Sequence, residues 1–88
     1  MKIEYLSKFL KDLDKIKSKK AKTAIREVII EVKSANSIKE INNLKKLTGH
    51  NFAYRIRTGQ YRIGVFIENE IVQFARVSHR KDIYRLFP

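Results

Sequence analysis

The chain has 88 residues, of which 43% are hydrophobic and 33% are charged, with three glycines and one proline. This composition is typical of a small globular protein and excludes disordered, collagen-like and low-complexity chains. The absence of cysteine excludes disulfide scaffolds, thiolate zinc sites and cysteine nucleophiles, and it fits a reducing compartment. We therefore expect a single domain over residues 1–88.

Twenty lysines and arginines against nine acidic residues give a net charge of +11. A charge of this size predicts a polyanionic partner, either a nucleic acid or an acidic protein. No apolar stretch approaches the roughly 20 residues that cross a membrane, and the first residues lack the apolar run of a signal peptide. We expect a cytoplasmic protein without a membrane partner.

The first half of the chain predicts one strand and two antiparallel helices. Residues 2–6 alternate between polar and apolar side chains, as a short strand does. Ser7 stands where it could cap a helix over residues 8–17, and residues 18–20 form a turn. The next helix has the strongest amphipathic pattern of the chain. Its apolar positions are Ala21, Ala24, Ile25, Val28, Ile29 and Val32.

Shorter elements follow the second helix. Residues 35–37 end that helix, and Ser37 with Glu40 matches a capping box, which predicts a short helical turn. A second strand is expected over residues 44–47 and a loop over residues 48–51.

The last part of the chain predicts an antiparallel meander with strands at residues 52–57, 61–68 and 71–78. Thr58-Gly59 and Asn69-Glu70 are the expected two-residue turns. Phe52, Tyr54 and Ile56 share the apolar face of the first of these strands. Residues 80–87 form a short terminal segment with a helical turn. The fold class is α+β: an N-terminal strand, a helical hairpin and a meander, with two helices covering one sheet face.

The two halves of the chain differ in their cations. Residues 1–50 contain twelve lysines and one arginine, whereas residues 51–88 contain six arginines and one lysine. Lysine suits a solvated helix surface, whereas the planar fork of arginine matches phosphate oxygens. The meander is therefore the expected ligand-binding part, and Asp12 and Asp14 are expected to form ion pairs on a lysine-rich helix.

Strand parity places three arginines on one sheet face. A turn at Thr58-Gly59 puts Arg55 opposite Arg62, and Arg57 opposite Gln60. All three arginines then lie on the face away from the apolar side chains of the same strands. Like charges in opposite positions destabilise a sheet, so we expect an anion to bind there. The alternative is a solvated face with splayed arginines.

The turn at Asn69-Glu70 extends this assignment to the last strand. Two residues in that turn place Gln73 and Val77 on the arginine face, whereas three residues would reverse the facing of the strand.

The C-terminal segment contains further candidates: His79, Arg80 and Tyr84. Histidine can move protons near neutral pH, and tyrosine can stack on a base or donate a proton. The alternatives are a surface histidine, and a tyrosine that anchors the core together with Ile83 and Phe87. Neither His79 nor His50 has acidic residues at metal-ligand spacing, so we expect no metal site.

Three segments together resemble the RelE/ParE superfamily of bacterial toxins from type II toxin–antitoxin systems. They are Leu44-x-x-Leu47-x-Gly49, Tyr54-Arg55-Ile56-Arg57-x-Gly59-x-Tyr61-Arg62 and Val77-x-His79-Arg80-x-x-Ile83-Tyr84. The resemblance implies a ribosome-dependent endoribonuclease that cleaves mRNA with the ribose 2′-OH as nucleophile, without metal or cofactor. It also implies a cognate antitoxin, besides the ribosome and mRNA, as partner.

The resemblance also assigns roles to residues. Arg62 and Arg80 are the expected phosphate clamp. Arg55 and Arg57 occupy positions that are typically lysine in RelE proteins. In this chain the two arginines would hold the mRNA backbone. Arginine stays protonated and is a poor general base, so proton transfer falls to Tyr84 or His79, or the reaction is slower.

Two alternatives use the same fold and charge. One is a ParE-like inhibitor of DNA gyrase without nuclease activity, and the other is a non-catalytic RNA-binding module, for which the net charge alone would suffice.

Overall fold

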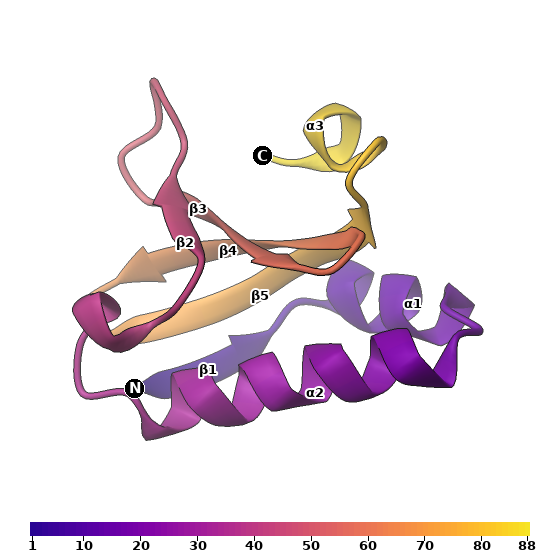
Figure 1. The fold of residues 1–88 in the computed structure, drawn as a ribbon. Coiled ribbons are helices and arrows are strands. Elements are labelled where there is room, and N and C mark those ends of the chain that lie inside the picture. The colour runs from indigo at the N-terminus through magenta and orange to yellow at the C-terminus, as the bar shows by residue number, and fades with distance from the viewer.

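The computed structural model describes residues 1–88 and contains the predicted strand, helical hairpin and meander (Figure 1). The N-terminal elements are β1 (Lys2–Tyr5), α1 (Ser7–Lys15), α2 (Lys19–Ser34) and the 3-10 turn η1 (Ile38–Glu40). The C-terminal elements are β2 (Leu44–Lys46), β3 (Ala53–Thr58), β4 (Tyr61–Glu68), β5 (Ile71–His79) and α3 (Ile83–Leu86).

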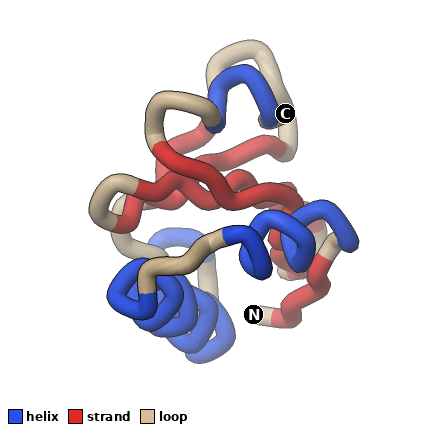
Figure 2. Tube along the Cα trace, turned by 90° about the vertical axis from the view of Figure 1, so that its right-hand side faces the viewer, coloured by secondary structure: helices blue, strands red, loops and turns tan.

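The five strands form one sheet in the order β1-β5-β4-β3-β2. β1 runs parallel to β5, and the other neighbouring strands are antiparallel. α1 and α2 cover one face of the sheet, as predicted, whereas α3 lies on the opposite face (Figures 1 and 2). We call this opposite face, on which α3 lies, the open face. No helix is both long enough and apolar enough to span a bilayer.

Apolar side chains of α1, α2 and the sheet form the main core. Phe9 of α1, Ile25 and Val32 of α2, and Ile63 and Phe74 of the sheet are at most 1% exposed. Each such side chain contributes about 1.5–3 kcal/mol by leaving water. Because strand side chains alternate, the residues between these apolar positions point to the open face.

The helix ends differ slightly from the predicted bounds. α1 begins at Ser7 itself, with Leu6 as its N-cap residue and no side-chain cap. At α2, Ser18 Oγ accepts a hydrogen bond of 3.1 Å from the Ala21 N–H, which is the contact of an N-cap serine. The serine cap therefore belongs to the second helix and not to the first.

The helical turn predicted after α2 is present as η1, but the capping box is wrong. The Ser37 side chain makes no cap bond. The Glu40 N–H that this side chain should bind donates instead to the Ser37 carbonyl, at 3.1 Å. Glu40 Oε1 accepts from the Asn36 N–H at 3.2 Å. The Glu40 N–H is therefore already used by the 3-10 turn, and it is not free to bind the Ser37 side chain as a capping box requires.

The β3–β4 hairpin turns one residue later than predicted. Thr58 lies opposite Tyr61, so the two turn residues are Gly59 and Gln60. Gly59 has a φ of 58°, whereas Gln60 is not among the residues with positive φ. A positive φ at the first central residue alone is typical of a type II′ turn, which favours glycine at that position.

This turn changes the pairing of the arginines. Arg57 lies opposite Arg62, and Arg55 lies opposite Gly64. The predicted pairs of Arg55 with Arg62 and of Arg57 with Gln60 are therefore wrong. The register differs by two residues, an even number, so every side chain keeps its predicted face.

The β4–β5 hairpin confirms the predicted Asn69-Glu70 turn. Glu68 lies opposite Ile71, and the two turn residues have φ values of 52° and 65°. Two consecutive positive φ values are typical of a type I′ turn.

A β-bulge then reverses the facing within β5. Val65 lies opposite Phe74, but Gly64 lies opposite Arg76, so β5 carries one extra residue. Gln73, before the bulge, lies on the open face opposite Phe66, as predicted. Val77, after the bulge, is 2% exposed in the main core, so its predicted facing is wrong.

Phe52 is a further correction. It was expected among the apolar residues of a strand, but β3 begins at Ala53 and the Phe52 side chain is 47% exposed. The Phe52 carbonyl still accepts a hydrogen bond from the Ile67 N–H. Its backbone stays beside β4 while its side chain lies outside the core.

Candidate functional site

Three arginines lie on the open face of the sheet. Arg55 and Arg57 of β3 alternate with buried Ile56, and Arg62 of β4 lies opposite Arg57. The predicted facing of all three is confirmed. Because the opposite face packs on α1 and α2, the sheet holds these guanidinium groups on a rigid support.

Arg62 is the centre of this arginine group. Its Nη1 donates hydrogen bonds of 3.0 Å to the carbonyls of Gly59 and Tyr61, which hold the side chain against the hairpin turn. Burial lowers the pKa of Arg62, and the nearby charges of Arg55, Arg57 and Arg80 lower it further. Arg80, which follows β5, is held at the same hairpin by a 2.8 Å hydrogen bond from its N–H to the Gln60 carbonyl.

None of these four arginines has a carboxylate partner. The two ion pairs of the structure join Arg76 to Asp12 and Arg85 to Asp82. We call Arg55, Arg57, Arg62 and Arg80 the arginine cluster. Its uncompensated positive charge favours binding of an anion.

Tyr84 of α3 lies beside the arginine cluster. Arg55 Nη1 donates a hydrogen bond to the Tyr84 hydroxyl, and the guanidinium carbon lies 5.5 Å from the centre of the ring. Tyr84 is 65% exposed, whereas Ile83 and Phe87 are at most 5% exposed. The alternative in which Tyr84 anchors the core together with Ile83 and Phe87 is therefore wrong, because only Ile83 and Phe87 do so.

One donor at this position has no partner. Arg55 Nε is buried and makes no hydrogen bond. A buried donor without a partner costs stability, and such atoms are uncommon in folded proteins. Because this atom is closed to solvent, it adds a cost to the position of Arg55 and offers no contact to a ligand.

A hollow of about 340 Å³ adjoins Arg55 and Tyr84. It is bounded by β2, the following loop and the C-terminal segment. Its other lining residues are Lys45, Lys46, Leu47, Thr48, His50, Phe87 and Pro88. The sequence analysis missed Lys45, Lys46 and His50, because the lysines were assigned to solvated surface. Lys45 lies opposite Arg55 in the β2–β3 pairing. A predicted register for these two strands would therefore have placed Lys45 at the site.

His79 does not join the other site residues. It is the last residue of β5 and lies opposite Tyr61, with the two rings 6.0 Å apart and nearly perpendicular. Tyr61 packs on the main core, so His79 lies on the helix side of the sheet. The structure therefore brings together Arg55, Arg57, Arg62, Arg80 and Tyr84, and it places His79 on the other face.

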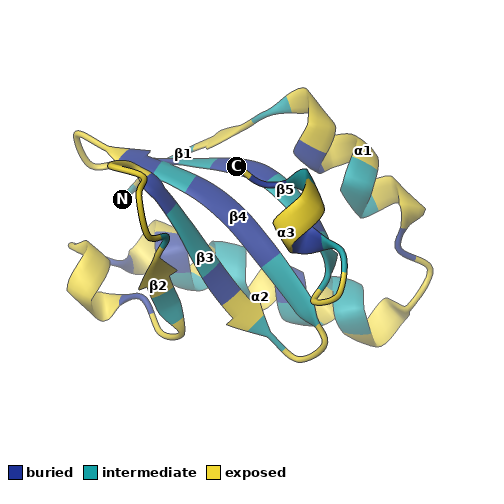
Figure 3. Ribbon diagram, turned by 90° about the horizontal axis from the view of Figure 1, so that it is seen from above, coloured by how far each residue is buried: buried dark blue, intermediate teal, exposed yellow.

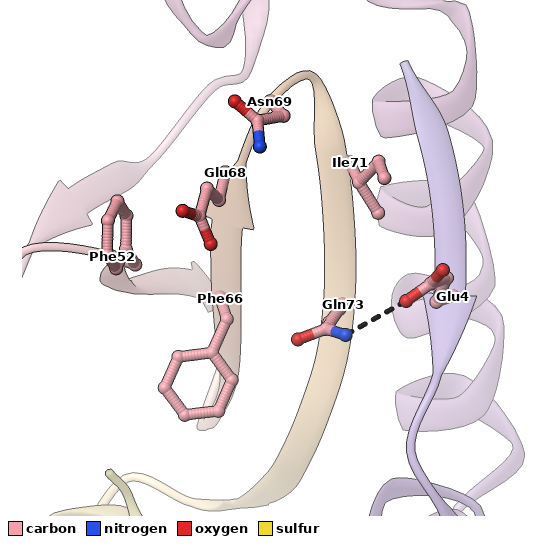
Figure 4. Close-up of a pocket in the computed structure, with 7 residues that line it drawn as sticks. All are labelled: Glu4, Phe52, Phe66, Glu68, Asn69, Ile71 and Gln73. Carbon is pink, nitrogen blue, oxygen red and sulfur yellow. Dashed lines mark hydrogen bonds between the residues drawn. The ribbon is translucent and has the colours of Figure 1, made fainter.

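The far end of the open face is acidic. A smaller hollow of about 140 Å³ lies beside the Asn69-Glu70 turn, with Glu4 and Glu68 in its wall (Figure 4). Gln73 Nε2 donates a hydrogen bond of 2.9 Å to Glu4 Oε1 across the sheet. Two carboxylates thus lie at one end of the open face, and the arginine cluster lies at the other. No three His, Cys, Asp or Glu side chains come close enough to hold a metal ion.

Comparison with known proteins points to one group. A family model described as the ParE toxin of the type II toxin-antitoxin system parDE matches residues 3–84. The chain is 38% identical, over 89 positions and 100% of both chains, to Toxin RelE3 of Methanocaldococcus jannaschii.

The solved structures agree. The chain resembles the toxin of a RelB-RelE antitoxin-toxin complex from Methanococcus jannaschii, with a TM-score of 0.81, 35% identity and coverage of 97% of this chain and 99% of that one. The isolated E. coli RelE toxin has a TM-score of 0.69 at 17% identity, with coverage of 97% and 92%, and shows the fold alone.

Proposed function

The chain belongs to the family of ParE toxins of type II toxin–antitoxin systems, within the RelE/ParE superfamily, and we propose that it is an endoribonuclease that cleaves mRNA on the ribosome. The 38% identity to Toxin RelE3 over the whole chain supports the RelE-like branch. The observation that carries the proposal is the arginine cluster with exposed Tyr84 beside it.

The cluster is suited to phosphate. Cleavage by the ribose 2′-OH forms a bond from the 2′-oxygen to phosphorus and breaks the bond from phosphorus to the 5′-oxygen. The 2′-OH gives its proton to water as it attacks, and the 5′-oxygen receives a proton as it leaves. Negative charge builds on the phosphate oxygens in the transition state, and fixed cations lower its free energy. Arg62 and Arg80 clamp this phosphate in our proposal, while Arg55 and Arg57 hold the neighbouring backbone.

Tyr84 is the proposed proton-transfer residue. The 5′-oxygen needs a proton as it leaves. The arginine side chains stay protonated at neutral pH and are therefore poor proton donors. The Tyr84 hydroxyl lies at Arg55 on the open face, whereas His79 lies on the helix side of the sheet. The ring of Tyr84 is also exposed enough to stack on a base.

We further propose an acidic antitoxin as the protein partner. The solved relatives include complexes of RelE proteins with RelB antitoxins. A protein of net charge +11 attracts an acidic partner. Such a partner on the open face would compete with RNA for the arginine cluster.

The direct test is translation in a reconstituted cell-free system, with mRNA 5′ ends mapped by primer extension. Wild-type protein should produce new mRNA ends only when ribosomes are present. Arg62→Ala and Arg80→Ala should each reduce cleavage about 10²–10³-fold, the usual effect of removing a group that stabilises developing charge. Arg26→Ala, an exposed site on α2, makes the same charge change and should leave cleavage unchanged. Intact mRNA with normal protein yield would contradict nuclease activity, and a gyrase supercoiling assay would then test the ParE-like alternative.

A second test separates the two proton-transfer candidates. Tyr84→Phe keeps the ring but removes the hydroxyl, so the single-turnover rate should fall about 10²-fold. His79→Ala should stay within about twofold of wild type, as expected for a residue outside the reaction. The opposite order of effects would assign proton transfer to His79.

A further inference from the structure

A second, smaller core lies on the open face, beneath α3. Its buried members are Ala53, Ala75, Ile83 and Phe87, and Phe66 packs against them. α3 has only four residues, and a single helical turn is not stable without tertiary contacts. The side chains of this small core therefore fix where α3 lies, and Figure 3 shows α3 directly above the central strands.

Phe87 rests on a glycine of the sheet. A Cβ atom placed on Gly64 would lie 2.5 Å from both Cγ and Cδ2 of the Phe87 ring. Contacts this short do not occur, so the ring occupies the space that any other residue at position 64 would fill. The Phe87 ring also lies 5.0 Å from the ring of Phe66.

The backbone does not itself require glycine at position 64. The glycines with positive φ are Gly49 and Gly59, and Gly64 is not among them. Glycine in the middle of a strand costs stability and often marks a close approach by another part of the chain. The Phe87 ring is that approaching part.

Position 64 is also next to the site. Gly64 lies directly opposite Arg55 in the β3–β4 ladder, and Arg55 donates its hydrogen bond to Tyr84. Phe87, three residues after Tyr84, closes α3 with a 2.8 Å hydrogen bond from its N–H to the Ile83 carbonyl. Tyr84 itself is largely exposed and has little packing of its own.

We propose that Gly64 and Phe87 form a seat that positions Tyr84 at Arg55, and that both are positioning residues for RNA cleavage. This inference rests on the proposed function, because it concerns the same site. Tyr84 is held at the arginine cluster through the residue that follows its helical turn. The bare backbone of Gly64 sets how close the C-terminal segment comes to the sheet.

Gly64→Ala tests the seat. The added methyl group should lift Phe87 and move Tyr84 away from Arg55. Displacement of a reacting group by about 1 Å can cost 10²-fold in rate, so we expect cleavage to fall between about tenfold and 10²-fold with little change in KM. Hydrogen exchange at the Phe87 amide should speed up about tenfold, while exchange of the Ile63 and Val65 amides in the main core stays slow.

Rescue distinguishes this seat from a general loss of fold. Leucine at position 87 is smaller, so the double variant Gly64→Ala with Phe87→Leu should regain room beneath α3. The matched control is Phe87→Leu alone. We expect the cleavage rate of the double variant, and the hydrogen exchange of its backbone amide at position 87, to return to within about threefold of the control values. A Gly64→Ala protein with wild-type exchange and cleavage would overturn the proposal, as would a double variant no better than Gly64→Ala.

The two readouts separate this inference from the proposed function. If the wild-type protein cleaves no RNA, the proposed function fails, yet hydrogen exchange still reports whether Gly64 seats Phe87. If the wild type cleaves and Gly64→Ala cleaves at the same rate with the same exchange, only the seat is wrong and the proposed function stands.

Discussion

Arg57 and Arg62 lie directly opposite each other on β3 and β4, and neither has a carboxylate partner. Like charges at such a position destabilise a sheet. Repulsion from Arg57 is also one of the causes, after burial, of the lowered pKa of Arg62. Stability given up in this way is common where a protein binds a ligand of opposite charge.

The repulsion can be measured. Arg57→Thr should raise the free energy of unfolding by about 0.5 kcal/mol at low salt, because one of two opposed cations is removed and threonine suits a strand. Urea denaturation at low and high salt measures the gain, which should shrink as salt screens the charges. Arg57→Lys keeps the charge and should give no gain. Equal gains from both variants would show that repulsion is not the cause.

Local residue patterns predict which face a side chain takes, but not what it touches. The arginine face followed from strand alternation, and it is correct for Arg55, Arg57 and Arg62. The residue opposite Arg62 depends on which two residues form the β3–β4 turn. Glycine at position 59 fits both a Thr58-Gly59 turn and a Gly59-Gln60 turn. The hollow beside Tyr84 combines residues 45–50 with the C-terminal segment, and no short-range pattern reports such a meeting.

Among the elements, α1 does more than cover the main core. β1 pairs with β5 only as far as Phe74, and beyond that residue α1 lies at the edge of β5. Asp12 Oδ2 accepts a hydrogen bond of 3.1 Å from the Val77 N–H, and its carboxylate also binds Arg76 at 2.7 and 3.1 Å. These hydrogen bonds raise the pKa of Arg76. Where β1 no longer pairs with β5, the Asp12 side chain binds the free backbone N–H of β5 and so protects this edge of the sheet.

Removal of this carboxylate should weaken the fold. Asp12→Ala leaves the Val77 N–H without its partner, and we expect the free energy of unfolding to fall by about 1–2 kcal/mol in urea denaturation. Asp14→Ala removes the same charge from an exposed position on the same helix and should have little effect. A similar loss in both variants would point to helix propensity or overall charge instead of the edge contact.

Element order was easier to predict than element detail. Helical and strand periodicity located β1, α1, α2 and the strands of the meander, since both patterns are local. The bounds of α1 differ from the predicted 8–17 because Ser7 lies inside the helix without a cap bond and Ile16 already has an extended backbone. The facing of Val77 was wrong because a bulge adds one residue to β5, and the sequence at that position carries no turn signal.

Across the whole molecule, charge is arranged along the open face. Glu4 and Glu68 lie at the end near the β4–β5 turn, and the arginine cluster lies toward the β3–β4 turn. A polyanion is attracted to one end and repelled from the other. The proposed RNA would therefore bind near the β3–β4 turn and not along the whole open face.

Binding to RNA should depend strongly on salt. The ligand is a single-stranded RNA with a 2′-deoxy nucleotide at the cleavage site, which prevents cleavage. The logarithm of its binding affinity should fall linearly with the logarithm of the salt concentration. Arg55→Ala and Arg57→Ala should each reduce the magnitude of this slope by about one, because each removes one phosphate contact. Arg26→Ala on α2 should leave the slope unchanged. Equal slope changes for all three variants would indicate binding to overall charge instead of the cluster.

The parallel pairing of β1 with β5 sets the order in which the protein can mature during its own synthesis. Lys2 pairs with Ile71 and Tyr5 with Phe74, so the first strand to be translated has no neighbouring strand until most of the chain has been made. The helical hairpin, whose contacts are local, can form much earlier. The arginines of β3 and β4 also precede Tyr84 and Phe87 along the chain. A nascent chain therefore carries three arginines of the cluster before it has Arg80 and the segment that completes the site, and the proposed toxic activity would be delayed until translation is nearly finished.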